Sequence, residues 1–242
     1  MIGGRTINPL IAKLQTMAVL PEDDCRAVEA ICGRARSVQK GKDLARDGDK
    51  PEHVTLLLEG WAARYAALPD GSRQITAFLL PGDLCDAELA GFKRMHYSVT
   101  ALTPVTVSLI EREALIRLTR ERGELAQAFW WASLLDAAVL RAWVVNLGRR
   151  DAYTRIAHLV CELHARTETI GLANSPAFNL PLTQEQLGDA LGLTPVHVNR
   201  VLKRLRDEGI MELRNRTLTL HDAERLGVAA GFDPGYLDTF GA

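Results

Sequence analysis

The sequence lacks the patterns that mark several broad classes of protein. It has no N-terminal signal built from a basic, an apolar and a small-residue segment, and no uninterrupted apolar run approaches the roughly 20 residues that cross a bilayer. The formal net charge is only −1, which argues against a general binder of polyanions. These absences predict a cytoplasmic protein with no membrane partner, in which any contact with nucleic acid comes from a local basic surface.

Motifs of catalysis and cofactor binding are also missing. The cysteines contain no C-x-x-C pair, so neither a zinc site nor a disulfide framework is indicated for Cys25, Cys32, Cys85 and Cys161. No nucleophile elbow, H-E-x-x-H sequence or phosphate loop occurs. We therefore expect no enzyme activity, and the sequence indicates no cofactor.

A few isolated polar residues leave alternatives open. His158, Cys161 and Glu162 share one face of a predicted helix, a spacing that could begin a metal site or place a redox-sensitive thiol near DNA. Packing of Cys161 in a core is the simpler interpretation. His53 and His96 could be haem ligands, although single histidines are more often hydrogen-bonded loop residues.

Residues 182–211 carry the boundary signals of two short helices joined by a tight turn. Thr183 is placed to be the N-cap of the first helix, and Gln186 three residues later completes a capping box. Gly192 supplies the turn, and Thr194 is placed to cap the second helix ahead of a proline. Together these signals predict a helix-turn-helix.

The second of these helices has an apolar and a basic face. The inward positions recur at helical spacing and are Val198, Val201, Leu202 and Leu205. The opposite face holds Val196, His197, Asn199, Arg200, Lys203, Arg204 and Arg206. Such a helix fits the major groove, where its first residues meet base edges and its later cations meet phosphates.

Residues 210–220 follow as a predicted hairpin with a polar tip at 214–216, which makes the unit a winged helix-turn-helix. A helical hairpin that merely packs would explain the apolar face, but not the caps, the wing and the basic face together. We therefore predict DNA contacts from Thr183, Thr194, Val196, His197, Asn199, Arg200, Lys203, Arg204, Arg214 and Arg216.

The N-terminal half changes from helical to strand periodicity. Residues 1–35 predict a pair of helices, and residues 36–110 show a period of two, with Gly or Pro turns between short segments. This pattern favours an antiparallel roll or sandwich. The predicted fold class is α+β, with a β-roll domain at 1–122, a dimerisation helix and hinge at 123–148, and a DNA-binding domain at 149–242.

The predicted long helix runs from Gly123 to Leu147, with Gly148 as the residue that ends it. Apolar and small residues recur at steps of three and four, which predicts a dimer seam of Leu125, Ala128, Ala132, Leu135, Val139, Ala142 and Asn146. A second apolar stripe, which includes Trp130 and Leu134, is expected to pack on the roll. The alternative is a buried helix in a monomer.

This order of parts resembles the CRP/FNR family of bacterial transcription regulators across nearly the whole chain. The resemblance rests on the turn series from Gly41 to Leu84, the helix at 149–163, and the segments 182–188 and 193–202. It implies a homodimer that reads a near-palindromic site, a roll that senses a signal, and a hinge after the long helix that re-aims the recognition helices.

The recognition helix departs from the family pattern at its start. Family members commonly carry Arg and Glu at its first two positions, where this chain has Pro195 and Val196, whereas Arg200 matches a later family arginine. We expect Val196 to touch a thymine methyl group, Asn199 to reach an adenine edge, and Arg200 to contact guanine O6 and N7.

The roll departs further from members that bind cyclic nucleotides. Such members resemble one another in a Gly-Glu-Leu segment followed by an arginine that neutralises the cyclic phosphate. Here Glu88 is a possible ribose ligand, but Tyr97 and Ser98 stand where the arginine pair belongs. Because a buried phosphate without a cationic partner is costly, we expect no dependence on cyclic AMP. The clustered N-terminal cysteines of iron–sulfur members are also absent.

Three functions follow as hypotheses. The first is a dimeric regulator that binds operator DNA and responds to a small ligand or to redox state through the roll. The second is a regulator with a ligand-blind roll, controlled by its abundance or by a partner such as RNA polymerase. The third is a cyclic-nucleotide-binding module whose helix-turn-helix is vestigial, or a cyclic-nucleotide-responsive regulator with an altered phosphate site.

Overall fold

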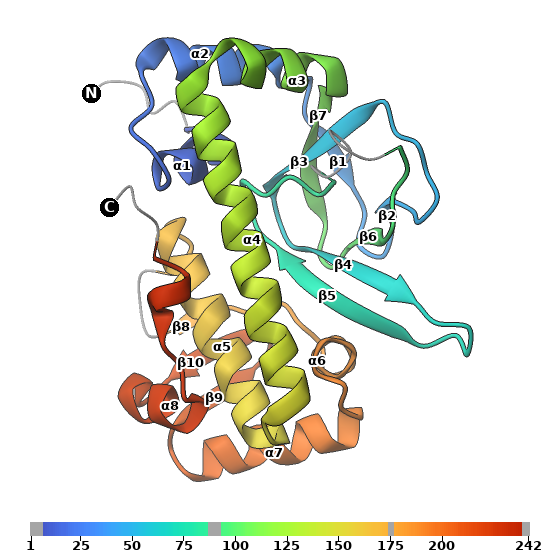
Figure 1. The fold of residues 1–242 in the computed structure, drawn as a ribbon. Coiled ribbons are helices and arrows are strands. Elements are labelled where there is room, and N and C mark those ends of the chain that lie inside the picture. Colours follow the sequence, from blue (N-terminus) through green and yellow to red (C-terminus); the bar gives the residue numbers. More distant parts are fainter. Residues whose placement is uncertain (1–6, 87–92, 174–176, 239–242) are drawn as a thin grey trace. The chain divides into compact units, whose positions relative to one another are not determined.

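The computed structural model describes residues 7–86, 93–173 and 177–238, and its elements are labelled in Figure 1. The chain divides into two compact units. One combines residues 1–64 and 78–134, and the other combines 65–77 and 135–238. The division falls inside the long helix, and it assigns the tip of one β-hairpin to the second unit.

The first unit begins with the predicted helix pair. The helix α1 (Pro9–Gln15) is capped by Asn8, whose side chain accepts from the Leu10 amide at 3.0 Å. The helix α2 (Glu22–Ile31) opens with three acidic residues, which favour the positive end of its dipole. An ion pair between Lys13 Nζ and Asp83 Oδ1 at 2.6 Å ties α1 to the strand region.

Short strands follow in the described residues up to Glu111, as the alternating pattern predicts. They are β1 (Arg36–Val38), β2 (Asp43–Ala45), β3 (His53–Glu59), β4 (Ala62–Ala67), β5 (Arg73–Leu79), β6 (Ser98–Ala101) and β7 (Val105–Glu111). They form two sheets, with strand orders β1-β7-β3 and β2-β6-β4-β5. The β1–β7, β3–β7 and β2–β6 pairings are antiparallel. A core of buried side chains from both sheets includes Leu57, Leu79, Val99 and Val107.

The predicted turns are confirmed by backbone geometry. Glycines in five of them have φ between 79° and 93°. Two also lie where a side chain would collide: a Cβ atom would come within 2.5 Å of the Pro104 carbonyl oxygen at Gly60, and of the Pro9 carbonyl oxygen at Gly82. Only glycine satisfies both requirements at these two turns.

The helix α3 (Arg112–Glu121) leads into α4 (Gly123–Arg149), which is 27 residues long. Figure 1 shows α4 as one uninterrupted helix. Gly148 does not end this helix as predicted, because helical structure continues through it to Arg149. By length and composition alone, α4 is also long and apolar enough to cross a bilayer, contrary to our expectation from uninterrupted apolar runs. Its exposed apolar residues are confined to one stripe, however, as described below.

The second unit contains the helix-turn-helix and its wing. Its elements are α5 (Ala152–Thr169), β8 (Ala177–Asn179), α6 (Gln184–Leu191), α7 (Pro195–Asp207), β9 (Met211–Arg214), β10 (Thr217–Leu220), α8 (Ala223–Ala230) and the 3-10 turn η2 (Pro234–Tyr236). The α5 helix is capped by Asp151, which accepts from the Thr154 amide at 2.8 Å. The short strand β8, which the sequence pattern did not predict, pairs with β10.

Candidate nucleic-acid interface

The caps of α6 and α7 form as the sequence predicts. Thr183 Oγ1 accepts from the Gln186 amide at 3.1 Å, and the Gln186 side chain accepts from the Thr183 amide at 2.9 Å. Thr194 Oγ1 accepts from the His197 amide at 3.3 Å. Gly192 ends α6 in the left-handed conformation, with φ 63° and ψ 39°. These bonds fix the point at which α7 leaves the turn.

A close approach between α6 and the turn fixes their relative angle. A Cβ atom on Gly188 would lie 2.4 Å from the Leu193 carbonyl oxygen. The Leu193 amide also donates back to the Gly188 carbonyl at 3.1 Å. The glycine at position 188 therefore allows the backbone of the turn to contact the first helix directly.

The two predicted faces of α7 are confirmed by burial. Of the four predicted inward residues, Val198, Val201 and Leu205 are buried, and Leu202 is half-buried. The seven residues assigned to the outer face are all exposed, and Val196 exposes 70% of its surface. The basic outer face is therefore open to solvent in the isolated chain.

The cations of α7 differ in how strongly the protein already holds them. Arg204 Nε donates to Glu208 Oε1 at 2.7 Å, and its guanidinium lies 4.5 Å from the centroid of the Tyr153 ring. Burial, followed by the hydrogen bond to Glu208, raises the pKa of Tyr153 to about 12, so the ring stays neutral. Within the described part of the chain, Arg200 and Lys203 form no ion pair, which leaves both available to a ligand.

The wing is a tight hairpin with two cations at its tip. Asn215 and Arg216 occupy its turn with φ 51° and 64°, the positive values that this kind of hairpin turn needs. Arg214 and Arg216 are exposed, and Arg214 Nε lies 3.7 Å from Glu212 Oε1. The Leu180 amide donates to the Arg216 carbonyl at 2.8 Å and anchors the wing to β8.

All ten residues predicted to contact DNA thus lie in the second unit. All but Thr183 are exposed, on α7, on the wing or, for Thr194, at the cap of α7. Thr183 is half-buried, and its hydroxyl oxygen serves mainly as a helix cap. Arg204 is exposed but engaged with Glu208. The direct contacts with DNA remain predictions.

The histidine–cysteine–glutamate face of α5 does not form a metal site. No group of three His, Cys, Asp or Glu side chains among the described residues could hold a metal ion. Burial raises the pKa of Cys161 to about 12, which disfavours the reactive thiolate. His158 is buried, its pKa is lowered to about 4 by burial and then by Arg150, and its ring stacks on Tyr236. These side chains belong to the core of the second unit.

The roll holds an arginine that sequence comparison did not identify. Arg64 donates from Nε to the Cys85 carbonyl at 3.1 Å and from Nη2 to the Leu84 carbonyl at 2.8 Å. Its guanidinium lies 5.5 Å from the centre of the Tyr97 ring, and the Tyr97 hydroxyl donates to the same Cys85 carbonyl at 3.5 Å. Strand β4 thus places a cation beside Leu84, Cys85 and Tyr97, in the segment where family members carry their phosphate-binding arginine.

The other predicted effector residues have different positions. Ser98 accepts from the Asp47 amide at 3.1 Å and therefore supports the sheet. Glu88 lies outside the described residues. His53 lies in β3 and is half-buried, while His96 is exposed in a loop. Asp86 is buried, and it accepts from the Thr55 amide at 2.7 Å and from the Thr55 hydroxyl at 3.2 Å.

The predicted dimer seam on α4 needs correction. Leu125, Ala128, Val139 and Asn146 are already buried within the chain, and Asn146 Nδ2 donates to the Arg155 carbonyl at 3.2 Å. Ala132, Leu135 and Ala142 are half-buried on the same face. The exposed large apolar residues lie on the other stripe, which was expected to pack on the roll. They are Trp130, Leu134, Leu140, Val144 and Val145.

Comparison with known proteins agrees with both halves of the chain. A model of the cyclic nucleotide-binding domain matches residues 35–122, and a model of the Crp-like helix-turn-helix domain matches residues 154–228. These two matches correspond to the strand-rich region and to the region that contains α5, the helix-turn-helix and the wing.

Relatives of similar length are transcription regulators rather than enzymes. The transcriptional activator protein FnrL of Cereibacter sphaeroides is 31% identical over 202 residues, covering 82% of this chain and 81% of that protein. The nitrogen fixation regulation protein FixK of Bradyrhizobium diazoefficiens is 29% identical over 198 residues, covering 82% of each. The solved structure of FixK2 from Bradyrhizobium japonicum matches with a TM-score of 0.75 and 27% identity, covering 83% of this chain and 98% of that one. The chain therefore belongs to the CRP/FNR family of DNA-binding transcription regulators.

Proposed function

We propose that this regulator acts as a homodimer that reads a near-palindromic operator, with one α7 helix placed in a major groove at each half-site. The observation that supports it most strongly is the exposed apolar stripe on α4. In this arrangement residues 1–122 form the effector-like roll, 123–148 the dimerisation helix and hinge, and 149–242 the DNA-binding domain. Family membership already implies DNA binding, and the dimer explains the stripe.

The stripe follows the spacing of a coiled-coil seam. Three of its residues, Trp130, Leu134 and Val144, fall with the half-buried Ala137 and the charged Arg141 on successive steps of four and three residues. Trp130 exposes 58%, Leu134 39% and Val144 64% of their surfaces. An apolar stripe of this length is costly in water unless a partner covers it. A second copy of α4 about a two-fold axis would pair the stripe with itself.

A charge in this stripe should break the dimer. Because each substitution appears twice at a two-fold interface, Leu134→Glu would place two like charges in contact, and we expect the dimer dissociation constant to rise at least tenfold. Val228→Glu is the matched control, since Val228 is an exposed apolar residue on α8. Sedimentation equilibrium measures both variants. A Leu134→Glu protein as dimeric as the parent chain would contradict the proposed interface.

The same variant connects assembly to DNA binding. A monomer engages one half-site only. We therefore expect Leu134→Glu to bind the operator much more weakly than the parent chain does, while its fold stays intact. Circular dichroism of Leu134→Glu should match that of the parent chain. If the monomeric variant bound a full operator as tightly as the dimer does, two-site recognition would be excluded.

We further propose that each α7 helix combines base contacts with phosphate contacts. Arg200 has the fork geometry for guanine, and Asn199 and Val196 are exposed at the first turns of the helix. Lys203 and the wing arginines are placed to neutralise phosphates. RNA polymerase as a partner and a cytoplasmic location are further parts of this proposal.

The roll is proposed to function without cyclic AMP. Arg64 already donates from Nε and Nη2 to the carbonyls of Cys85 and Leu84, so part of its donor capacity is used within the fold. Tyr97 offers no cation. These contacts favour control by another signal, by protein abundance or by a partner.

Calorimetry of the full chain with cyclic AMP or cyclic GMP tests this part of the proposal. A ligand at about 100 times its dissociation constant stabilises the fold by roughly 2.7 kcal/mol, so a melting temperature that does not move at millimolar nucleotide would support the proposal. A saturable heat at low micromolar nucleotide that Arg64→Gln removes would overturn it and identify Arg64 as the phosphate ligand.

A further inference from the structure

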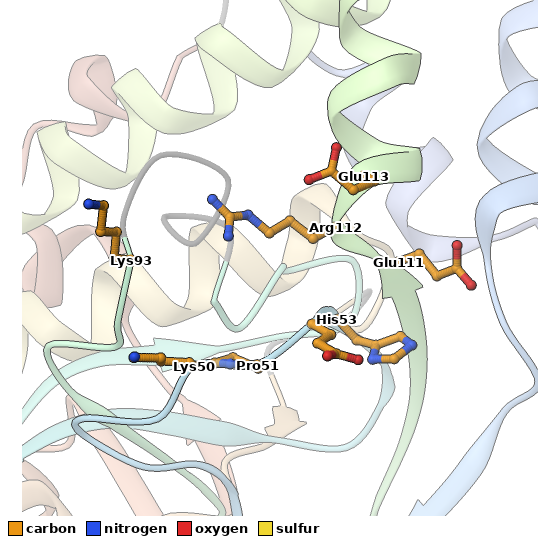
Figure 2. Close-up of a pocket in the computed structure, with 8 residues that line it drawn as sticks. Lys50, Pro51, His53, Lys93, Glu111, Arg112 and Glu113 are labelled. Atoms are coloured by element: carbon orange, nitrogen blue, oxygen red, sulfur yellow. The ribbon is translucent and has the colours of Figure 1, made fainter.

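A cavity in the first unit shares no lining residue with the Arg64–Tyr97 contact. Its volume is about 580 Å³, which falls within the range of small-molecule sites. The walls come from the segment that enters β3, the end of β7 and the first turn of α3, together with Lys93 (Figure 2).

Backbone bonds hold these walls together. The Arg112 amide donates to the Glu52 carbonyl at 3.0 Å, and His53 pairs with Glu111 in the β3–β7 ladder. On the opposite wall the Met95 amide donates to the Asp49 carbonyl at 2.9 Å, close in sequence to both lysines of the cavity. The cavity is therefore part of the sheet framework, and its position does not depend on exposed side chains alone.

Arg112 carries an unusual feature. Its Nε atom is buried, with no hydrogen-bond partner in the structure. A buried N–H of a charged group without an acceptor costs free energy, and native proteins rarely leave one in that state. Because Nε itself is not accessible from the cavity, a bound molecule would meet the terminal guanidinium nitrogens of Arg112, which form no hydrogen bond or ion pair among the described residues.

Two lysines join this arginine at the cavity. Figure 2 shows the Arg112 guanidinium extended toward the side of the cavity where Lys93 lies, with the Glu113 carboxylate directed toward the Arg112 side chain. Lys50 lies on the lower side of the same view, and the Glu111 carboxylate points away. No ion pair to Lys50, Lys93 or Arg112 occurs in the parts of the chain that the structure describes. Three cations thus lie around one space that the carboxylates of Glu52, Glu111 and Glu113 also line, and none of the three cations is ion-paired with them.

We propose that this cavity binds a small phosphorylated molecule that also carries hydroxyl groups. The phosphate would accept hydrogen bonds from Arg112, Lys93 and Lys50, since charge-assisted bonds to phosphate are the strong ones. Glu52 and Glu113 also line the cavity, and their carboxylates are hydrogen-bond acceptors suited to sugar-like hydroxyl groups. The ligand class is therefore a sugar phosphate or a nucleotide.

Isothermal titration of the full-length protein at constant ionic strength tests the cationic part, with pyrophosphate as the probe. We expect saturable binding below millimolar concentration, and at least a tenfold weaker affinity in Arg112→Gln, because a hydrogen bond to a charged group is lost. Lys93→Gln provides a second variant in case Arg112→Gln disturbs the fold. No saturable heat with millimolar pyrophosphate would overturn the proposal.

Two controls separate the cavity from general anion binding. Lys40→Gln removes the same charge from an exposed turn of the first unit, and Arg200→Gln removes a cation from the DNA-binding face. Both should bind pyrophosphate as the parent chain does, and equal weakening in either control would refute the assigned site.

A third arm tests the hydroxyl groups. Ribose 5-phosphate should bind at least threefold more tightly than inorganic phosphate, and Glu52→Gln should remove that advantage. Equal affinities would contradict the hydroxyl-bearing ligand class.

Discussion

The indole nitrogen of Trp143 donates to both carboxylate oxygens of Glu162, at 3.1 and 3.0 Å, and so joins α4 to α5. Glu162 is fully buried and also accepts from the Tyr236 hydroxyl at 3.1 Å, with Arg166 Nη1 at 3.5 Å. Burial raises the pKa of this carboxyl group, while Arg166 acts in the opposite direction. One buried acid therefore holds together the long helix, the helix after the hinge and the C-terminal turn.

Replacing Trp143 by Phe should lower the free energy of unfolding by about 1–3 kcal/mol, because the buried carboxylate loses a donor and no water replaces it. Urea unfolding followed by circular dichroism measures the change. In a Glu162→Gln background the same substitution should cost less, since the acceptor is no longer charged. Equal costs in the two backgrounds would show that the effect comes from packing of the indole alone.

The helix-turn-helix was predictable because its signals are local. Thr183, Gln186, Gly192 and Thr194 each act within four residues, so the sequence contains the complete reason for each cap and turn. The same is true of the glycine turns in the roll. The predicted faces of α7 agree with the structure because its four apolar residues recur at helical spacing, and this spacing defines which face of the helix turns inward.

The face of α4 was not predictable in this way. Two stripes on the helix both follow steps of three and four residues, and Arg141 makes the exposed one look less like an interface. Which stripe is buried depends on residues distant in sequence, such as the Arg155 carbonyl that receives the Asn146 amide. Exposed Trp130 and Leu134 are the signal that decides between them, and this signal exists only in the folded chain.

Arg64 was missed for a related reason. In sequence it is one cation in a strand, and the strand pattern gives no indication that it reaches the carbonyls of residues 84 and 85. Long-range side-chain contacts of this kind depend on strand order, which alternation of apolar residues does not specify. The family motif places its arginine near Tyr97 in sequence, whereas the structure provides one from β4.

Arg200→Ala and Lys203→Ala should change DNA binding in two different ways. Arg200→Ala is expected to cost roughly 1–3 kcal/mol for the specific operator and to relax base preference at one position of each half-site. Lys203→Ala should weaken all sequences about equally and reduce the salt slope by about 1. Binding titrations at several salt concentrations, with matched and mismatched duplexes, distinguish the two. Unchanged discrimination in Arg200→Ala would mean that α7 enters the groove in another register.

Gly188→Ala should disrupt the turn between α6 and α7. The new Cβ atom would lie 2.4 Å from the Leu193 carbonyl oxygen, which is backbone and cannot move aside cheaply. We expect a loss of about 1–3 kcal/mol in unfolding free energy, as for other overpacked sites, together with weaker operator binding.

Gly227→Ala is the matched control for this substitution, since Gly227 lies inside α8 and a Cβ atom there would have nothing within 4 Å. There alanine should stabilise the helix by about 0.5–1 kcal/mol. Thermal unfolding of the two variants should move in opposite directions. A neutral Gly188→Ala protein would show that the turn is more adaptable than the hydrogen bond between Leu193 and Gly188 suggests.

Asp86 should make the stability of the roll depend on pH. Burial raises the pKa of this carboxyl group to about 6, against the hydrogen bonds from Thr55, whereas an aspartate in the unfolded chain titrates near 4. The folded state therefore holds the proton more tightly, so the stabilisation is fully present below about pH 4 and is lost as the pH rises through about 6, a change of about 2–3 kcal/mol. Asn at position 86 cannot titrate, so the difference in unfolding free energy between the parent chain and Asp86→Asn should shift by that amount between pH 4 and 7. A pH-independent difference for Asp86→Asn would mean that Asp86 stays ionised throughout this range.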